Sequence, residues 1–171
     1  ITTEKVRGWF TGRLPDEWKV EAPEVAVDRD EVTVILTIAD VELPDGTLLA
    51  GTSTEHAGWV VHVERWSGGD IALPQAWWRS APLNQVQVFG AIQPTLLFHS
   101  PTRVQALCRS RQGVVTEAWS EDAGATWGPM TATALPNPSA GIDALRLADG
   151  RFLLVYNPTT SGRDRLEVAV S

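Results

Sequence analysis

Cysteine is almost absent from this sequence. Cys108 is the only one among 171 residues, so the chain can form neither an internal disulfide nor a metal site built from several cysteines. Tyrosine is equally scarce, because Tyr156 is the single one in the chain. Folding must therefore depend on an ordinary apolar core, which a hydrophobic content of 43% can supply.

Positive charge and long apolar runs are also scarce. Lys and Arg total 14 against 21 Asp and Glu, which gives a formal net charge of -7, and no basic run interrupts this balance. We therefore expect neither nucleic acid nor an anionic membrane as a partner. No apolar stretch approaches the ~20 residues of a membrane-spanning helix, so the sequence predicts no membrane segment.

Motifs for metals and cofactors are missing as well. His56, His62 and His99 do not have the spacing of metal ligands. The sequence has no glycine-rich loop of the type that binds nucleotide phosphates or dinucleotides. We predict that the protein holds no metal and no cofactor.

What the sequence does have is a repeated pattern of short β-strands. Three stretches with a turn in the same place recur at a spacing of about 50 residues, which is typical of propeller repeats. They lie at 43–49, 97–104 and 147–153. A second strand is expected after each turn, at 48–52, 104–109 and 152–156, and a third at 59–64, 114–119 and 166–170. The repeat unit is therefore a small antiparallel meander.

The first 30 residues do not follow this pattern. Thr3 is placed to cap a short helix that ends at Gly12 and Pro15. We therefore treat residues 1–30 as a separate N-terminal segment, either helical in part or fused from another protein. The continuous β-branched run at 32–38 then predicts a strand buried on both faces.

The most specific motif is the stretch Ser120-Glu121-Asp122-Ala123-Gly124-Ala125-Thr126-Trp127. Its Ser and Asp side chains can bond backbone amides around a tight turn, and its Gly can take positive φ without steric cost. We expect a hairpin corner that satisfies its own hydrogen bonds and is anchored by the indole. A degenerate counterpart lies at 67–70, and Ser171 stands where a further copy would begin.

Ser-x-Asp-x-Gly-x-Thr-Trp is the Asp-box pattern, and residues 41–171 resemble the Asp-box (BNR repeat) sialidase or neuraminidase-like proteins. The resemblance extends to the stretches 89–94, 107–111, 136–143 and 156–158. It implies an all-β fold, a partial β-propeller of about three antiparallel blade-like repeats at 31–85, 86–135 and 136–171, the last one truncated. In that family the box is a structural corner on the outer rim, so none of its residues is expected to be catalytic.

The resemblance also implies a glycoside hydrolase whose substrate pocket lies on the propeller axis, at the ends of the inner strands. Arg109 and Arg111 stand two residues apart after an apolar strand. They therefore share a face, where their guanidinium groups can grip a carboxylate or sugar hydroxyls. Arg165 is a third candidate anion contact. The alternative for the pair is an ordinary exposed strand end.

Glycoside hydrolysis uses a proton donor together with a nucleophile or base. Asp143 is the candidate general acid, and turn capping is its alternative role. Glu55 is a second candidate catalytic residue and His56 a candidate substrate-binding residue, since they offer an adjacent carboxylate and imidazole. Tyr156 closes an apolar run, so it is expected in the core rather than as a nucleophile. The resemblance places three amide side chains among the substrate-binding residues: Gln93, Asn137 and Asn157.

Two functions fit these residues. The first is a sialidase-like glycoside hydrolase fragment whose parent acts on a terminal sugar, an acidic one being suited to the arginines. The second is a non-catalytic carbohydrate-binding or oligomeric scaffold module built from propeller blades. Trp77 and Trp78 fit either a sugar-stacking platform or mixed core and surface roles.

The predicted partners follow from the number of blades. A closed propeller needs ~4 to 8 blades, more than the three repeats of this chain. We therefore expect its edges to be covered by the N-terminal segment, by a second copy of the chain or by a completing propeller segment. The expected partners are a carbohydrate and either a second copy of the chain or such a completing segment.

Overall fold

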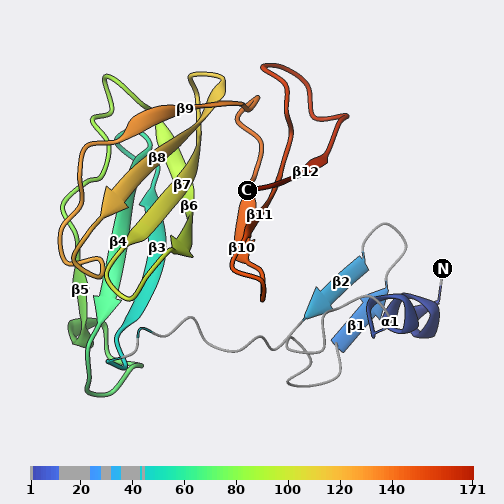
Figure 1. Cartoon of the computed structure of the whole chain (residues 1–171), viewed down its shortest axis with the longest axis horizontal. Helices are drawn as coiled ribbons and strands as arrows, with labels where there is room; N and C mark the ends of the chain where they lie inside the picture. Colours follow the sequence, from blue (N-terminus) through green and yellow to red (C-terminus); the bar gives the residue numbers. More distant parts are fainter. Residues whose placement is uncertain (1, 12–23, 28–31, 36–42, 44) are drawn as a thin grey trace. The chain divides into compact units, whose positions relative to one another are not determined.

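The computed structural model describes residues 2–11, 24–27, 32–35, 43 and 45–171 (Figure 1). The chain divides into two compact units, Ile1–Val41 and Glu42–Ser171. The first unit contains a helix and a hairpin, and the second contains the repeated strands.

The N-terminal unit consists, in its described part, of helix α1 (Thr3–Thr11) and an antiparallel pair, β1 (Glu24–Val27) with β2 (Val32–Ile35). The strand expected at 32–38 is thus present as far as Ile35, and residues 36–38 lie outside the described ones. Because β2 pairs with β1, it lies in the N-terminal unit. The predicted boundary between residues 30 and 31 stays a prediction.

The cap of α1 differs by one residue from the expected one. Thr2 Oγ1 accepts a hydrogen bond from the Lys5 amide at 3.4 Å, so Thr2 takes the place that we assigned to Thr3. Thr3 is instead the first residue of the helix. Neighbouring threonines offer the same hydroxyl, which is why sequence alone does not separate them.

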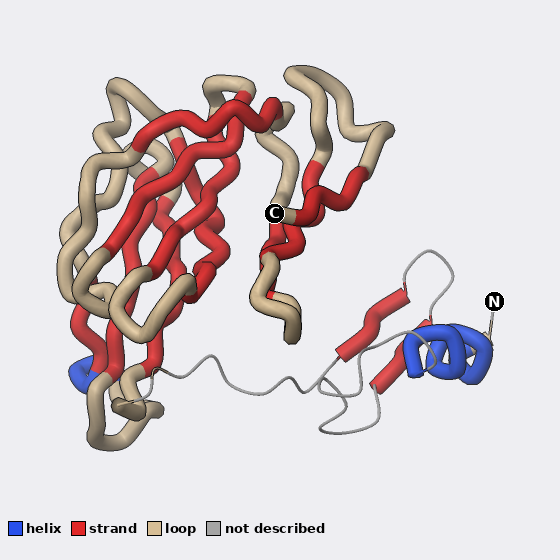
Figure 2. Tube along the Cα trace, in the orientation of Figure 1, coloured by secondary structure: helices blue, strands red, loops and turns tan. Residues whose placement is uncertain are grey.

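The second unit consists of three antiparallel sheets, whose strands follow one another in chain order (Figure 2). The first sheet is formed by β3 (Leu48–Thr54), β4 (Val60–Trp66) and β5 (Trp77–Arg79). The second is formed by β6 (Ala91–Phe98), β7 (Val104–Ser110), β8 (Val114–Ser120) and β9 (Thr131–Pro136). The third is formed by β10 (Asp143–Arg146), β11 (Phe152–Tyr156) and β12 (Glu167–Val170). The predicted all-β fold of blade-like meanders is confirmed.

The four-stranded sheet is covered by apolar side chains on both faces. On one face Val61 and Val63 of β4 pack with Ala106 and Cys108 of β7, and burial there raises the pKa of the Cys108 thiol to about 12. The opposite face is packed by residues of the second and third sheets, including Leu97, Leu107, Val115, Leu154 and Tyr156. Tyr156 is 8% exposed, so it is a core residue as expected. Successive side chains of β7 point to opposite faces of its sheet, so β7 contributes to both apolar clusters. The three blade-like sheets therefore pack together as one unit.

Close backbone packing joins the first and second sheets. A Cβ on Gly51 of β3 would lie 2.6 Å from the Pro94 carbonyl oxygen of β6. Glycine is thus required at this position because a backbone atom, which cannot rotate away, fills the space of a side chain.

The strand register defines two ends of the sheets. Ala91 pairs with Ser110 at one end of the second sheet, whereas Phe98 pairs with Val104, and Val104 with Ser120, at the other. The first end holds the starts of β6 and β10 and the ends of β3, β7 and β11, and we call it the site end. The opposite end carries the Asp box, and we call it the box end.

The Asp box forms the hydrogen-bonded corner that its sequence predicts. The Ser120 hydroxyl donates to Asp122 Oδ1 (2.8 Å) and accepts from the Gly124 amide (2.8 Å). Asp122 also accepts hydrogen bonds from the Thr126 amide (2.7 Å) and hydroxyl (2.6 Å). The Trp127 indole donates to the Gly124 carbonyl oxygen at 3.2 Å. Ser120, Asp122, Thr126 and Trp127 are thus all used to hold the turn.

The box also packs against the preceding sheet. Gly124 has a φ of 79°, and a Cβ there would lie 2.7 Å from Leu49 Cδ1 of β3. In the degenerate counterpart of the first sheet, the Asp70 carboxylate accepts a hydrogen bond from the Ala72 amide (3.0 Å). The Trp77 indole nitrogen donates there to the Ile71 carbonyl oxygen (2.9 Å), so a bond from an indole to a turn carbonyl oxygen recurs in the first sheet.

Candidate functional site

Two strained residues mark the site end. Gln93 has a φ of 54° within an irregularity of β6 between Ile92 and Thr95, and Ser139 has a φ of 59° in the segment between β9 and β10. Residues other than glycine rarely adopt such angles, and they cluster at functional sites when the surrounding fold holds them there. Gln93 is exposed, and its backbone amide donates a hydrogen bond to Ser53 Oγ of β3 at 3.3 Å.

Arg109 and Arg111 lie on one tryptophan. The guanidinium carbon of Arg111 is 4.1 Å from the centre of the Trp59 ring, and that of Arg109 is 5.2 Å from it. Trp59 belongs to the segment between β3 and β4 of the first sheet, whereas Arg109 is in β7 of the second sheet and Arg111 is in the turn after it. The strand on which we expected the two arginines to share a face thus ends between them, and what they have in common is their contact with Trp59.

A third arginine reaches the same place from another loop. Arg109 Nη1 and Arg163 Nη2 both donate to the Ser139 carbonyl oxygen, at 3.0 and 2.9 Å. Arg163 comes from the loop between β11 and β12, so two sheets direct guanidinium groups to one backbone oxygen. Arg165, which the sequence suggested as the third anion contact, instead pairs with Glu167.

The predicted amide residues hold this arrangement together. Asn157 is 6% exposed and donates from Nδ2 to the carbonyl oxygens of Arg165 (2.6 Å) and Arg163 (3.4 Å), which fixes the loop carrying Arg163. Asn137 is fully buried, and its Oδ1 accepts from the Ala140 amide at 2.9 Å, which fixes the turn around Ser139.

Two buried donors near Ser139 lack a protein partner among the described residues. They are Asn137 Nδ2 and Arg109 Nε. Buried polar groups are nearly always hydrogen-bonded, so an unpaired one indicates a site for a water molecule or a ligand atom. Both donors belong to residues that contact the Ser139 turn.

The candidate acids are exposed rather than enclosed. Asp143, the first residue of β10, accepts a hydrogen bond from Thr95 Oγ1 of β6 at 3.0 Å. Glu55 and His56 follow β3 and are also exposed. All three lie toward the site end, but no hydrogen bond or ion pair joins Asp143 to Glu55 in the described structure. The burial that would favour a general acid at Asp143 is absent.

Sequence reasoning did not identify three residues of this site: Trp59, Ser139 and Arg163. A signal existed only for Arg163, which stands two residues before Arg165 in the same loop. Trp59 is one of eight tryptophans, and the contribution of Ser139 is a backbone oxygen, which any residue provides.

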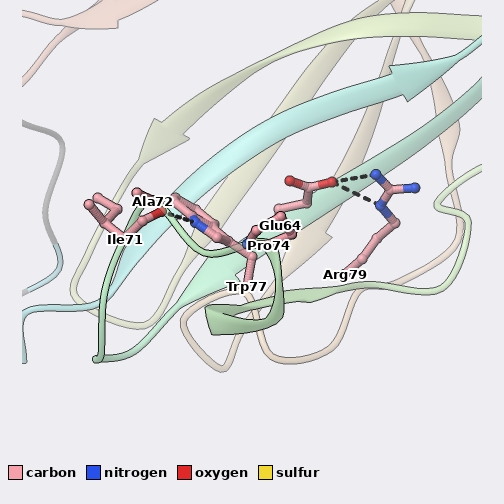
Figure 3. A pocket seen from close by; sticks show the side chains of 6 residues that line it. All are labelled: Glu64, Ile71, Ala72, Pro74, Trp77 and Arg79. Atoms are coloured by element: carbon pink, nitrogen blue, oxygen red, sulfur yellow. Dashed lines mark hydrogen bonds and ion pairs between the residues drawn. The ribbon is translucent and has the colours of Figure 1, made fainter.

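The described surface also has a shallow pocket away from these residues, on the first sheet (Figure 3). Its lining includes Glu64, Trp77 and Arg79, and Arg79 donates to Glu64 Oε1 through two nitrogens, at 2.8 and 2.6 Å. Trp77 is half-buried and the adjacent Trp78 is 51% exposed, which is the mixed arrangement that we expected of neighbouring strand residues. None of the predicted site residues lines this pocket.

The described residues offer neither a metal-binding cluster nor a membrane-spanning helix. They contain no group of three or more His, Cys, Asp and Glu side chains able to hold a metal ion. In the same residues, no helix has the length and apolar character that crossing a membrane requires.

Solved structures of similar fold come from sialidases and related proteins. The K499G mutant of NanB sialidase from Streptococcus pneumoniae superposes with a TM-score of 0.60 and 17% identity, over 82% of this chain and 24% of that one. The Hadza microbial sialidase Hz136 superposes with a TM-score of 0.58 and 17% identity, over 76% of this chain and 26% of that one. A protein of unknown function from Dyadobacter fermentans superposes with a TM-score of 0.57 and 20% identity, over 74% of this chain and 35% of that one. At these identities the likeness establishes the fold, that of part of a sialidase-like propeller.

Sequence comparisons give one short match and one family match. The uncharacterised protein Rv1265 of Mycobacterium tuberculosis is 49% identical over 37 residues, which are 22% of this chain and 16% of that protein. This stretch is thus a small part of either protein. A family described as BNR repeat-like domain matches residues 15–171. Because that match covers most of the sequence, the chain belongs to the BNR repeat-like domain family.

Proposed function

We propose that the site end binds a terminal acidic sugar through Arg109, Arg111 and Arg163. The observation that carries this proposal is the convergence of these three side chains on Trp59 and on the Ser139 carbonyl oxygen. None of the three forms an ion pair with a described carboxylate. Four other arginines of the described chain do so, namely Arg79, Arg103, Arg151 and Arg165.

Electrostatics favours an anionic ligand at this place. Like charges held close together repel one another, and the repulsion weakens when an anion binds between them. The planar guanidinium group presents donors in a fork that matches a carboxylate. The chain has a net charge of -7, so a local excess of positive charge is the exception on this molecule.

A sugar is favoured over other anions by the neighbouring groups and by the family. Gln93 supplies an exposed side chain whose amide can bond sugar hydroxyls at the same end of the sheets. The sialidase-like fold supports the same class of ligand. In this proposal Asn137 and Asn157 hold the loops that carry the binding groups.

We further propose that the bound sugar is hydrolysed. Asp143 would act as the general acid, with Glu55 and His56 as its candidate partners. A non-catalytic carbohydrate-binding module is the second candidate function, and the exposure of Asp143 and Glu55 favours it. In either case Arg109, Arg111 and Arg163 recognise the sugar.

A panel of fluorogenic glycosides separates the two functions. The protein is incubated with a neuraminide, a glucuronide and a glucoside, and binding of the corresponding free sugars is measured in parallel. Binding of the acidic sugars with release of the fluorophore supports a hydrolase. Binding without release supports the module, and absence of acidic-sugar binding contradicts the proposed function.

We also propose that a second copy of the chain covers the edge of the third sheet. Leu166, Val168 and Val170 alternate along this edge and are 68%, 59% and 48% exposed. An apolar strand with one unpaired edge is a template for association with another chain.

Val168→Lys is expected to convert an oligomer into a monomer, because a lysine on an edge strand opposes pairing. Val88→Lys is a matched control, since Val88 is 53% exposed and lies outside the strands. Light scattering coupled to size exclusion at low and high protein concentration gives the masses. A wild-type protein that stays monomeric at high concentration contradicts the proposed association.

A further inference from the structure

We infer that Trp59 is the positioning residue of the candidate site: its ring holds Arg109 and Arg111 side by side while leaving their donors available to a ligand. The inference rests on the proposed function for its ligand, an acidic sugar. It concerns a residue that has no predicted role and that lies in a different sheet from the two arginines.

The geometry places both guanidinium groups within range of one aromatic ring. Their carbons lie 4.1 and 5.2 Å from the ring centre, inside the distance of about 6 Å at which a cation is attracted by an aromatic ring. Arg109 belongs to β7 and Arg111 directly follows its last residue, Ser110, so the two arginines are close along the chain. One ring can therefore contact both.

An aromatic face differs from a carboxylate in what it does to an arginine. A carboxylate neutralises the charge and occupies the hydrogen-bond donors in the guanidinium plane. A ring attracts the cation but leaves both its charge and its in-plane donors available. Arg109 fits this description, because it bonds the Ser139 carbonyl oxygen through Nη1 while its buried Nε has no described partner.

Trp59 is itself held in place by a buried amide. Asn84 is 5% exposed, and its Nδ2 donates to the carbonyl oxygens of Trp59 (2.8 Å) and Phe89 (2.7 Å). Asn84 Oδ1 accepts from the Val61 amide at 2.8 Å. The segment that carries Trp59 is therefore tied to the start of β4 and to the loop before β6. A fixed backbone under the ring is what a positioning role requires.

The first arm of the test needs no ligand. In side-chain NMR spectra, the Hε signals of Arg109 and Arg111 are expected to be displaced by the ring current of Trp59. Trp59→Leu should remove this displacement from both arginines, and Trp59→Phe should retain part of it. Trp78→Leu is the matched control, since Trp78 is an exposed tryptophan at the opposite end of the same sheet. Arginine signals that do not respond to Trp59→Leu overturn the inference.

The second arm uses glucuronic acid as the probe in titration calorimetry. Loss of two cation–aromatic contacts in Trp59→Leu should weaken its binding about tenfold, whereas Trp59→Phe should weaken it about threefold or less. Unchanged binding in Trp59→Leu overturns the positioning role. If wild-type protein binds no acidic sugar although the arginine signals respond to Trp59→Leu, the proposed function fails and the stacking on Trp59 stands.

Discussion

Arg109→Met is expected to weaken the binding of glucuronic acid by about 100-fold, because a hydrogen-bonded charge contributes roughly 1.5 to 3 kcal/mol. Methionine retains much of the apolar stem, so packing against neighbours changes little. The Ser139 carbonyl oxygen keeps its hydrogen bond from Arg163, which limits the disturbance of the turn. Calorimetric titration of wild-type and variant protein gives the ratio of dissociation constants.

Arg79→Met is the matched control for this substitution. Arg79 is also a partly exposed strand arginine, but it lies in the pocket of the first sheet and is paired with Glu64. Its replacement should leave the dissociation constant of glucuronic acid unchanged. An equal loss of affinity in the two variants would show that net charge, rather than the site end, attracts the sugar.

Asp122→Ala is expected to lower the free energy of unfolding by about 2 kcal/mol, or the Tm by roughly 6 °C. The carboxylate accepts hydrogen bonds from Ser120 and from both the amide and the hydroxyl of Thr126, and alanine can replace none of them. Thermal denaturation measures the effect. Glu121→Ala is the control, because Glu121 makes only an exposed ion pair with Arg103 and should change stability by less than about 0.5 kcal/mol.

The effect of Asp122→Ala should also depend on pH. The Thr126 side chain, followed by the Thr126 amide, lowers the pKa of Asp122 below its ordinary value of 3.8. The ionised carboxylate therefore stabilises the fold at pH values above 3.8, and this contribution is lost as pH falls through the lowered pKa. The Tm difference between wild type and variant should be largest at neutral pH and should shrink in strong acid. A difference that grows in acid would contradict the assigned role of the carboxylate.

The strands and the box could be predicted because their signals are local. Apolar alternation defines the strand from Val104 to Ser110, and the residue types of 120–127 specify a turn whose bonds all lie within a few residues. These interactions form in the same way whichever sheet packs nearby. The fold class follows from them, since meanders of this length stack as blades.

The site could be predicted only in part because it depends on packing between sheets. The spacing of Arg109 and Arg111 made them candidates, but Trp59 meets them only when the first sheet packs on the second. The loop after Asn157 directs Arg163 to Ser139 and leaves Arg165 paired with Glu167. Sequence spacing does not reveal which of the two arginines in this loop reaches the Ser139 carbonyl oxygen.

The central claim is that the site end recognises the negative charge of a sugar, and one comparison of ligands tests it most directly. Glucuronic acid and its uncharged amide have nearly the same shape, so calorimetric titration with both isolates the contribution of the charge. We expect wild-type protein to bind the acid at least about tenfold more tightly than the amide, and Arg109→Met to remove most of this preference. Equal affinities of wild-type protein for the acid and the amide would contradict it.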